Sequence, residues 1–440
     1  MIKIILNREY RKEMAFNIDT NFRMAILGEN GIGKSIILKK LAKLDVDENW
    51  CSVEIPAKTK VAYFSQTEKT DLPISGGEHT KQRLEKLFSS KADLYVLDEP
   101  TNNLDQKNID WLEKYILEQN LKIVFTSHNI DFIDEMAEVI FYLDSKSVEK
   151  TQQKCSKYLE DRRQRIEKEF LDYEISQRTH TRLVSSAKLA QAEFEAGTKW
   201  ENEDKGLQGF KREMAGKFGG ATVKRLSKRA EQFDVKEPEN DPIPRVRLQN
   251  RGNLSDMLDF GGETLNNKKI FFKLSSGDKI IISGKNGVGK TNLIEKIVGY
   301  IDGKTVSHGE SFRKTGRMKY LYLSQNWYEK NEEEVVTDYL MKFFVEKEDA
   351  YRALSYNHLK SEILNKKFKN LSPGVRIKIL LGALSHSHYD LIIWDEPTNH
   401  LDVMTQYILH EAFINYQGAL IIITHDSKLL DDEHFLRIEI

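Results

Sequence analysis

The sequence predicts an α/β protein made of two copies of one fold joined by a helical hairpin. First, four short motifs recur in the same order in both halves of the chain. Second, apolar runs of strand length come directly before these motifs, and apolar runs of helical period follow the glycine-rich ones. Third, residues 151–240 between the copies have a different, helix-like pattern. We therefore expect domains at 1–150, 151–240 and 241–440.

Each copy contains a glycine-rich loop, a glutamine after a short strand, an acidic motif and a histidine. The motifs are GENGIGKS (28–35) and GKNGVGKT (284–291), YFSQ and YLSQ ending at Gln66 and Gln325, DEPTNNLD and DEPTNHLD ending at Asp105 and Asp402, and TSH and ITH ending at His128 and His425. Such matched order indicates that both copies carry the same chemistry.

One interval distinguishes the copies. The aspartate that opens the acidic motif lies 30 residues before the histidine in both. In contrast, Gln66 to Ser75 spans 9 residues, whereas Gln325 to Ser372 spans 47. The first copy thus lacks about 38 residues of a segment that reads as mostly helical in the second copy.

Composition excludes several classes of protein. The 67 basic and 68 acidic residues nearly balance, so any affinity for nucleic acid must come from a local patch. Two cysteines cannot form a disulfide framework or a multi-cysteine metal centre. No apolar run approaches the length of a membrane span, and the N-terminus lacks a secretory signal. We expect a cytoplasmic protein.

The segment between the copies predicts two helices. Apolar residues follow helical spacing in two stripes, Leu159, Ile166, Phe170 and Tyr173, and then Val223, Leu226, Ala230 and Phe233. Glycines at 197, 206, 209, 216, 219 and 220 are expected to interrupt the middle. The pattern favours an antiparallel hairpin with a loosely structured tip.

The glycine-rich loops have the G-x-x-x-x-G-K-[ST] pattern of a phosphate-binding loop. Glycines allow successive backbone N–H groups to surround phosphates at a helix N-terminus. Lys34 and Lys290 should reach the β- and γ-phosphates of ATP, and Ser35 and Thr291 should ligate Mg²⁺. The other residues expected to bind ATP here are Gly28, Asn30, Gly31, Gly33, Gly284, Asn286, Gly287 and Gly289.

The acidic motifs follow apolar strands and supply two carboxylates each. Asp98 and Asp395 would hold Mg²⁺, and Glu99 and Glu396 would polarise the attacking water. His128 and His425, at the ends of later buried strands, would contact the γ-phosphate.

Together these residues resemble the ATP-binding cassette (ABC) ATPases. The resemblance implies two P-loop ABC-type nucleotide-binding domains joined by an α-helical hairpin linker, with ATP and Mg²⁺ bound and ATP hydrolysed to ADP and phosphate. It implies Q-loop roles toward ATP and metal for Gln66 and Gln325. It also implies that each signature motif completes the ATP site of the opposite copy; the signature residues are Ser75, Gly76, Gly77, Ser372 and Gly374.

The two signatures differ. The first reads SGGEH, whereas the second reads LSPGVR, with Pro373 in place of a glycine. Proline has no backbone N–H and a fixed φ angle. Because both catalytic glutamates are present, we expect hydrolysis at both sites. We expect slower hydrolysis at the site built on Lys34, because the signature with Pro373 would complete it and offers one fewer N–H donor.

A fused cassette pair with a hairpin and the Thr-Asn-x-Leu-Asp ending resembles the ABC-F class, which acts on ribosomes. The resemblance implies a monomer whose own cassettes pair, without a membrane partner. Its hairpin would enter the tRNA exit site and meet P-site tRNA and large-subunit rRNA near the peptidyl-transferase centre. The candidate RNA-binding residues are Lys211, Arg212, Lys217, Lys224, Arg225, Lys228 and Arg229, in a stretch with one acidic residue, Glu213.

The short Q-loop-to-signature interval resembles the antibiotic-resistance, ribosomal-protection members of that class, the Vga-like group. The resemblance implies protection against lincosamides, pleuromutilins and group A streptogramins. Two alternatives are a housekeeping ABC-F factor acting on stalled ribosomes and the ATPase subunit of a membrane exporter. By position alone, Tyr10 and Phe260 are candidates for stacking on adenine.

Overall fold

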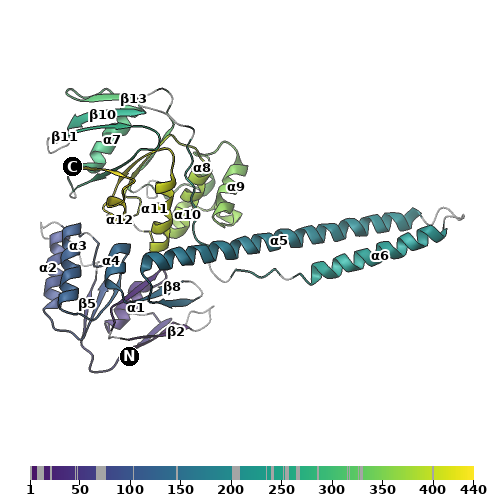
Figure 1. The fold of residues 1–440 in the computed structure, drawn as a ribbon, viewed down its shortest axis with the longest axis horizontal. Coiled ribbons are helices and arrows are strands. Elements are labelled where there is room, and N and C mark those ends of the chain that lie inside the picture. Colours follow the sequence, from purple (N-terminus) through teal and green to yellow (C-terminus); the bar gives the residue numbers. More distant parts are fainter. Residues whose placement is uncertain are drawn as a thin grey trace. The chain divides into compact units, whose positions relative to one another are not determined.

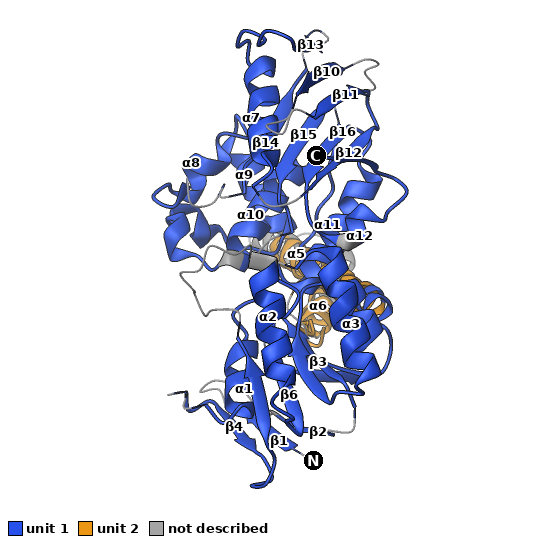
Figure 2. Ribbon diagram, turned by 90° about the vertical axis from the view of Figure 1, so that its left-hand side faces the viewer, with its two compact units in different colours: residues 1–160, 243–440 blue, residues 161–242 orange. Residues whose placement is uncertain are grey.

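The computed structural model divides the 440-residue chain into two compact units (Figure 2). One unit comprises residues 1–160 and 243–440 and holds both copies of the repeat; the other comprises residues 161–242. The structure describes the whole chain apart from residues 1, 7–13, 20–21, 45, 47, 66–75, 103, 145–146, 201–208, 234, 239–241, 251, 253–256, 264–267, 285–286, 315, 317, 326, 328–330 and 399–400. Within helices and strands, the side chains of residues 14, 76–77, 193–200, 209–219, 373 and 427 also lie outside the description.

The first copy has a six-stranded sheet in the order β5-β6-β7-β3-β8-β9, in which every neighbouring pair is parallel except β8 and β9. The strands are β3 (Met24–Gly28), β5 (Val61–Phe64), β6 (Leu94–Asp98), β7 (Ile123–Thr126), β8 (Val139–Leu143) and β9 (Val148–Thr151). A separate antiparallel sheet contains β1 (Ile2–Leu6), β2 (Met14–Ile18) and β4 (Cys51–Glu54). The helices are α1 (Lys34–Leu41), α2 (Gly76–Phe88), α3 (Gln106–Glu118) and α4 (Ile130–Met136).

The second copy has a similar plan, and strands of its parallel sheet are labelled in Figure 2. Its parallel sheet has the order β14-β15-β16-β12-β17, with β12 (Lys279–Ser283), β14 (Tyr320–Leu323), β15 (Leu391–Asp395), β16 (Ala419–Ile423) and β17 (Leu436–Glu439). Its antiparallel sheet contains β10 (Leu258–Glu263), β11 (Lys269–Leu274) and β13 (Ser311–Lys314). The helices include α7 (Lys290–Ile301), α10 (Pro373–Ser385), α11 (Val403–Asn415) and α12 (Ser427–Leu430).

The central strands are apolar throughout because both faces of each parallel sheet are covered. In the first copy, Ala25 and Leu27 of β3 point into one hydrophobic cluster, and Met24 and Ile26 point into another. Alternate side chains of a strand face opposite sides of its sheet, so β3 is packed on both sides. These buried strands hold the loops at their carboxyl ends in fixed positions.

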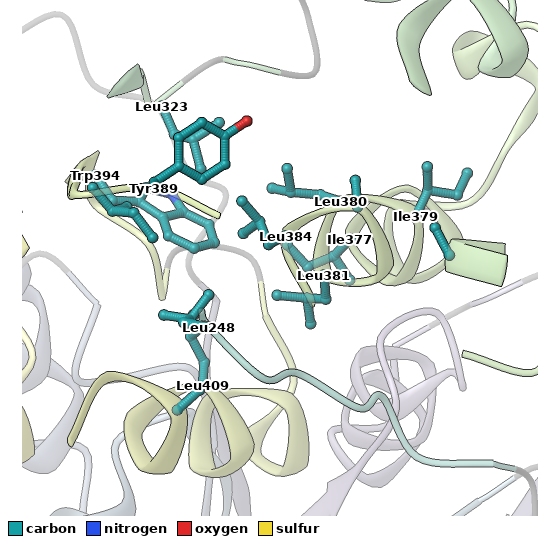
Figure 3. Packing of buried hydrophobic residues seen from close by; sticks show 14 of the residues in the cluster. Leu248, Leu323, Ile377, Ile379, Leu380, Leu381, Leu384, Tyr389, Trp394 and Leu409 are labelled. Carbon is teal, nitrogen blue, oxygen red and sulfur yellow. The ribbon is translucent and has the colours of Figure 1, made fainter. Parts of the chain in front are cut away.

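The second copy follows the same rule. Trp394 of β15 joins one cluster, whereas its neighbour Ile393 joins the cluster on the other face. Figure 3 shows Trp394 near Leu323 and Tyr389, with leucines of α10 in the same core. The core therefore extends from the sheet to the helix that begins at the second signature.

The segment that only the second copy has is partly helical, to a smaller extent than its sequence indicates. It contains α8 (Val336–Leu340), α9 (Lys347–Tyr356) and two 3₁₀ helices, Ser361–Asn365 and Phe368–Asn370. Phe368 is fully buried and its ring lies 4.7 Å from that of Tyr339. The segment is thus built around an aromatic core.

Two long helices dominate the remaining residues, α5 (Cys155–Trp200) and α6 (Gly209–Glu231) (Figure 1). The ring of Phe233, just after α6, lies 6.4 Å from that of His180 in α5, so the two helices form a hairpin. One expectation was wrong. Gly197 lies within α5, and Gly206 lies outside the described residues. The glycines at 209, 216, 219 and 220 lie within α6 and do not interrupt it. The lysine, arginine, methionine and alanine residues between them have high helical propensity, which offsets a cost of about 1 kcal/mol per glycine.

Within the described residues, no helix is both long enough and apolar enough to cross a membrane.

Candidate active sites

Each glycine-rich loop connects a buried strand to a helix, as a phosphate-binding loop requires. Gly33 and Gly289 cap α1 and α7 in the left-handed conformation, with φ angles of 91° and 100°. That conformation favours glycine, which explains the residue at these positions. The first backbone N–H groups of both helices are therefore directed into the loops, where an anion would find them.

The first glycine of each loop is required for a second reason. A Cβ atom at Gly28 would lie 2.0 Å from the carbonyl oxygen of Leu143, and one at Gly284 would lie 2.3 Å from that of Ile440. No side chain fits at such distances. The close approach places both loops directly against the ends of β8 and β17.

The loop lysines lie over their own loops. Lys34 Nζ donates to the carbonyl oxygens of Gly28 (2.8 Å) and Glu29 (3.0 Å), and Lys290 Nζ donates to that of Gly284 (2.8 Å). Burial lowers the pKa of Lys34, and nearby carboxylates, with Asp402 the strongest, oppose this effect. Both ammonium groups are thus held where they could meet phosphate oxygens.

The residues expected to bind Mg²⁺ are brought together in both copies. Ser35 Oγ donates to Asp98 Oδ1 at 3.2 Å, and Thr291 Oγ1 donates to Asp395 Oδ2 at 2.8 Å. A hydroxyl and a carboxylate are hard oxygen donors, which Mg²⁺ prefers together with phosphate oxygens and water. The donor set therefore fits Mg²⁺ bound with a nucleotide.

The two glutamates after these aspartates have an unusual backbone. Glu99 and Glu396 have φ angles of 51° and 50°, a left-handed conformation that costs non-glycine residues of the order of 1 kcal/mol. Each is held in it by a hydrogen bond from its N–H, to Thr126 Oγ1 at 3.1 Å or to the carbonyl of Ile423 at 2.9 Å. The turn directs each carboxylate away from its strand and toward the histidine.

Both carboxylates are nearly buried, and their pKa values are high. Burial raises the pKa of Glu99 to about 8, with Lys34 opposing and Asp98 adding to the shift. Burial also raises the pKa of Glu396 to about 7, to which the charge of Asp395 contributes. A carboxylate with a raised pKa is a better proton acceptor, which suits a base that polarises water.

The two histidines lie beside these carboxylates. His128 Nε2 is 3.2 Å from Glu99 Oε1, and His425 Nε2 is 3.6 Å from Glu396 Oε1. His425 Nε2 also lies 2.9 Å from Lys290 Nζ. Burial and the Lys290 charge lower the pKa of His425 to about 4, so its ring is neutral at neutral pH. Each predicted set of loop lysine, acidic pair and histidine thus converges at the carboxyl edge of its sheet.

The structure describes the backbone of the second signature motif and only part of the first. Ser372 caps α10, its Oγ accepting from the N–H of Val375 at 3.4 Å, and Pro373 occupies the first turn. A helix needs no N–H at its first position, so proline fits there. In the first copy, Gly76 and Gly77 begin α2. Gln66, Ser75 and Asn286 lie outside the described residues, and Gln325 is an exposed turn residue after β14.

The remaining residues predicted to bind ATP, RNA or adenine lie in loops, on exposed helix surface or in the core. Asn30, Gly31 and Gly287 lie in the turns of their loops, and Gly374 lies in the first turn of α10. Lys224, Arg225, Lys228 and Arg229 are exposed on α6; the side chains of Lys211, Arg212 and Lys217 are outside the description, as is Tyr10. The adenine-stacking expectation for Phe260 was wrong, because Phe260 is 2% exposed and packs against Phe272 in the core.

Sequence reasoning missed two polar contacts of the first site. Thr126 Oγ1 donates to Asp98 Oδ1 at 2.9 Å, and Tyr63 OH donates to Asp98 Oδ2 at 3.4 Å. Tyr63 belongs to YFSQ and Tyr322 to YLSQ, so the repeat itself held a signal for this tyrosine. Tyr322 OH is buried without a hydrogen-bond partner among the described residues, so the two acidic pairs have different surroundings.

The raised pKa of Glu99 predicts a stability effect. Replacing Glu99→Gln should stabilise the nucleotide-free protein more at about pH 8 than at about pH 5, by on the order of 1 kcal/mol or more. An ordinary glutamate ionises near 4.5, whereas folded Glu99 keeps its proton up to about 8. The folded state therefore binds more protons across this window, and the wild type loses stability as pH rises through it. Glutamine cannot ionise and avoids that loss.

Thermal unfolding at both pH values, in a chelator, measures the effect. The exposed Glu433→Gln serves as a control and should show no such difference. An equal gain for Glu99→Gln at both pH values would contradict the prediction.

Comparison with known proteins places this geometry in context. Residues 267–399 match the family model described as "ABC transporter". The chain is 27% identical to the ribosome protection protein VmlR of Bacillus subtilis, over 93% of this chain and 80% of VmlR. It is 28% identical to ABC transporter F family member 5 of Arabidopsis thaliana, over 81% of this chain but only 50% of that protein.

Among solved structures, archaeal ribosome recycling factor aABCE1, in its complex with the stalk protein aP1, matches with a TM-score of 0.52. The match covers 93% of this chain and 81% of the other at 13% identity, so it supports the fold alone. The chain has ABC-type nucleotide-binding folds and is homologous to ABC-F proteins, and these relationships indicate that it is an ATPase.

Proposed function

We propose that this chain is an ATP-dependent ribosome-binding protein that protects the ribosome from antibiotics. The observation that carries the proposal is the similarity to VmlR, a ribosome protection protein, which spans nearly the whole of this chain and four-fifths of VmlR. Because the match includes the region between the cassettes, it concerns more than the ATPase core. Work on ribosomes would place the chain in the cytoplasm.

The residues of the two sites would divide the work as follows. Lys34 and Lys290 bind the β- and γ-phosphates. Mg²⁺ is held by Ser35 with Asp98 in the first site and by Thr291 with Asp395 in the second. Gln66 and Gln325 contribute to binding of ATP and the metal. Glu99 and Glu396 orient and polarise the attacking water, and His128 and His425 contact the γ-phosphate. The distances support these roles, because in each copy the hydroxyl lies next to the aspartate and the histidine lies next to the glutamate.

The hairpin would bind RNA through the basic side chains of α6. Lys224, Arg225, Lys228 and Arg229 are exposed, and Lys224–Lys228 and Arg225–Arg229 are each four residues apart. Residues at this spacing share one helix face, so their charges could follow a phosphate backbone. Lys211, Arg212 and Lys217, which come earlier in α6, are further candidates for RNA binding. Large-subunit rRNA and P-site tRNA near the peptidyl-transferase centre would be the ligands.

The ATPase would act as a switch. ATP closes the paired cassettes and favours a hairpin geometry that enters the tRNA exit site; hydrolysis reopens them and releases the protein. Nucleotide can drive this only through a higher affinity for the closed state. In that position the hairpin would rearrange the rRNA nucleotides that bind lincosamides, pleuromutilins and group A streptogramins.

The drug spectrum and the resistance role distinguish this proposal from a housekeeping ABC-F factor. Expression of the chain in a sensitive host should raise the inhibitory concentrations of those three drug classes. The double variant Glu99→Gln, Glu396→Gln should lose the effect, since it cannot complete the cycle. Unchanged susceptibility with the wild-type chain would favour the housekeeping role.

Binding through the hairpin is testable separately. The double Glu→Gln variant should cosediment with ribosomes in ATP, because it closes but cannot reopen. Adding the substitutions Lys224→Gln, Arg225→Gln, Lys228→Gln and Arg229→Gln should weaken binding and reduce its dependence on salt. The log–log slope should fall by roughly one unit for each RNA phosphate that a basic side chain no longer neutralises.

A matched control replaces basic residues elsewhere, such as Lys58 and Lys91, which are exposed in the first copy. Cosedimentation unaffected by the four α6 substitutions would exclude this face as an RNA contact. A double Glu→Gln protein that stays free of ribosomes would refute the ribosomal function itself.

The two ATP sites should hydrolyse at different rates. Glu396→Gln leaves only the Lys34 site, which the Pro373 signature completes, and Glu99→Gln leaves only the Lys290 site. We expect single turnover to be roughly ten-fold or more slower in Glu396→Gln, because one N–H donor to the γ-phosphate is missing. Pro373→Gly in that background should recover part of the rate. Equal rates in the two single variants would contradict this expectation.

A further inference from the structure

A buried histidine outside the predicted site lies next to the loop that carries His425 in the second copy. His410, in the middle of α11, is 3% exposed, and its Nε2 lies 2.8 Å from Asp426 Oδ2. Asp426 directly follows His425. Among the described residues, His410 Nδ1 is buried without a hydrogen-bond partner, so the ring is held through Nε2.

Asp426 organises the short stretch of backbone that carries His425. Its N–H donates to Thr424 Oγ1 at 3.0 Å, and its Oδ1 accepts from the N–H of Lys428 at 3.0 Å at the start of α12. Its carbonyl accepts from the N–H of Leu430 at 3.0 Å. Oδ2 is the oxygen that meets His410. His425 thus lies between Thr424 and Asp426, and Asp426 is hydrogen bonded to α11 through its Oδ2 atom.

The contact is electrostatically favourable in its setting. Burial by itself would raise the pKa of Asp426, but the charge and hydrogen bond of His410, together with the Lys428 N–H, lower it. Lys428 Nζ also lies 4.9 Å from the ring centroid of Tyr407, one turn before His410, so α11 holds the loop at a second point. Because Asp402, the last residue of DEPTNHLD, caps α11 by accepting from the N–H of Thr405, the pair connects the helix after this acidic motif to the loop that carries His425.

The first copy does not have this pair. The residues at the same offsets are Glu113, eight positions after Asp105, and Asn129, which follows His128. Asn129 caps α4 by accepting from the N–H of Phe132 at 2.9 Å. Burial and the neighbouring acids, with Asp110 first, raise the pKa of Glu113 to about 7. An acid and an amide cannot form a histidine–carboxylate pair.

We propose that His410 is a positioning residue for the second ATP site: through Asp426 it fixes the loop that presents His425 to the γ-phosphate. Stability alone is a weak reason for such a pair, because burying two ionisable groups costs about as much as their attraction returns. A shift of about 1 Å in a group that contacts a transferring phosphoryl group can reduce turnover about a hundred-fold, so one buried anchor has a large effect on rate. The inference rests on the role proposed above for His425.

The test uses the full chain in the Glu99→Gln background, in which only the second site turns over, with kcat and KM for ATP as readouts. His410→Asn should lower kcat about ten-fold with KM changed less than about two-fold, because the shorter amide cannot reach Asp426. His410→Gln, whose longer amide can donate to Oδ2, should retain most of the rate. His434→Ala is the control: it removes an exposed histidine from a histidine–aspartate pair of 2.7 Å that lies outside the loop.

A double-mutant cycle then separates positioning from general structural damage. If His410 acts through His425, His410→Asn should cost nothing further in a His425→Ala protein. An equal loss of kcat in both backgrounds, equal rates for His410→Asn and His410→Gln, or wild-type kcat for His410→Asn would each overturn the proposal. If His425→Ala itself leaves kcat unchanged, the role proposed for His425 fails instead, so the two failures are distinguishable.

Discussion

The hydrogen bond between a loop hydroxyl and a strand-end carboxylate is the contact on which each site depends. Ser35 lies in the first turn of α1, which the phosphate loop joins to the end of β3, and Asp98 ends β6. Strand β7 separates β3 from β6 in the sheet. The bond therefore closes the carboxyl edge of the sheet across three strands and brings the phosphate loop to the acidic motif. All three strands are buried on both faces, so the core fixes Asp98 and the strand end that carries the phosphate loop. The equivalent bond of Thr291 and Asp395 does the same in the second copy.

The neighbouring glutamates show what the arrangement costs. A left-handed turn at Glu99 and Glu396, and burial that raises their pKa values, both oppose folding. The sheet can hold these residues because their N–H groups are bonded to the next strand, at Thr126 and Ile423. The free energy of folding is thus less favourable at Glu99 and Glu396, where a buried carboxylate is useful for polarising water.

Much of this was predictable from the sequence, because fixed intervals between motifs require fixed numbers of strands and helices between them. The convergence of Lys34, Asp98, Glu99 and His128 follows from parallel strands that end at one edge. The sequence could not show which polar neighbours complete the sites: Thr126, Tyr63 and His410 are reached through packing, not spacing. Phe260 failed as an adenine contact because position along the chain does not determine which face of a strand a ring occupies.

The helical segment that makes the second copy longer contacts the chain where it enters that copy. The chain entering that copy is hydrogen bonded to the segment that the first copy lacks and to the signature helix. The N–H of Arg245 donates to Asn357 Oδ1 just after α9, and the N–H of Arg247 donates to Ser385 Oγ at the end of α10. Gln249 bonds to the carbonyl of Ser385 at 2.6 Å. The added helices thus contact both α10 and the chain that enters the second copy. A movement of α10 would therefore also displace residues 245–249, which connect the hairpin to the second copy.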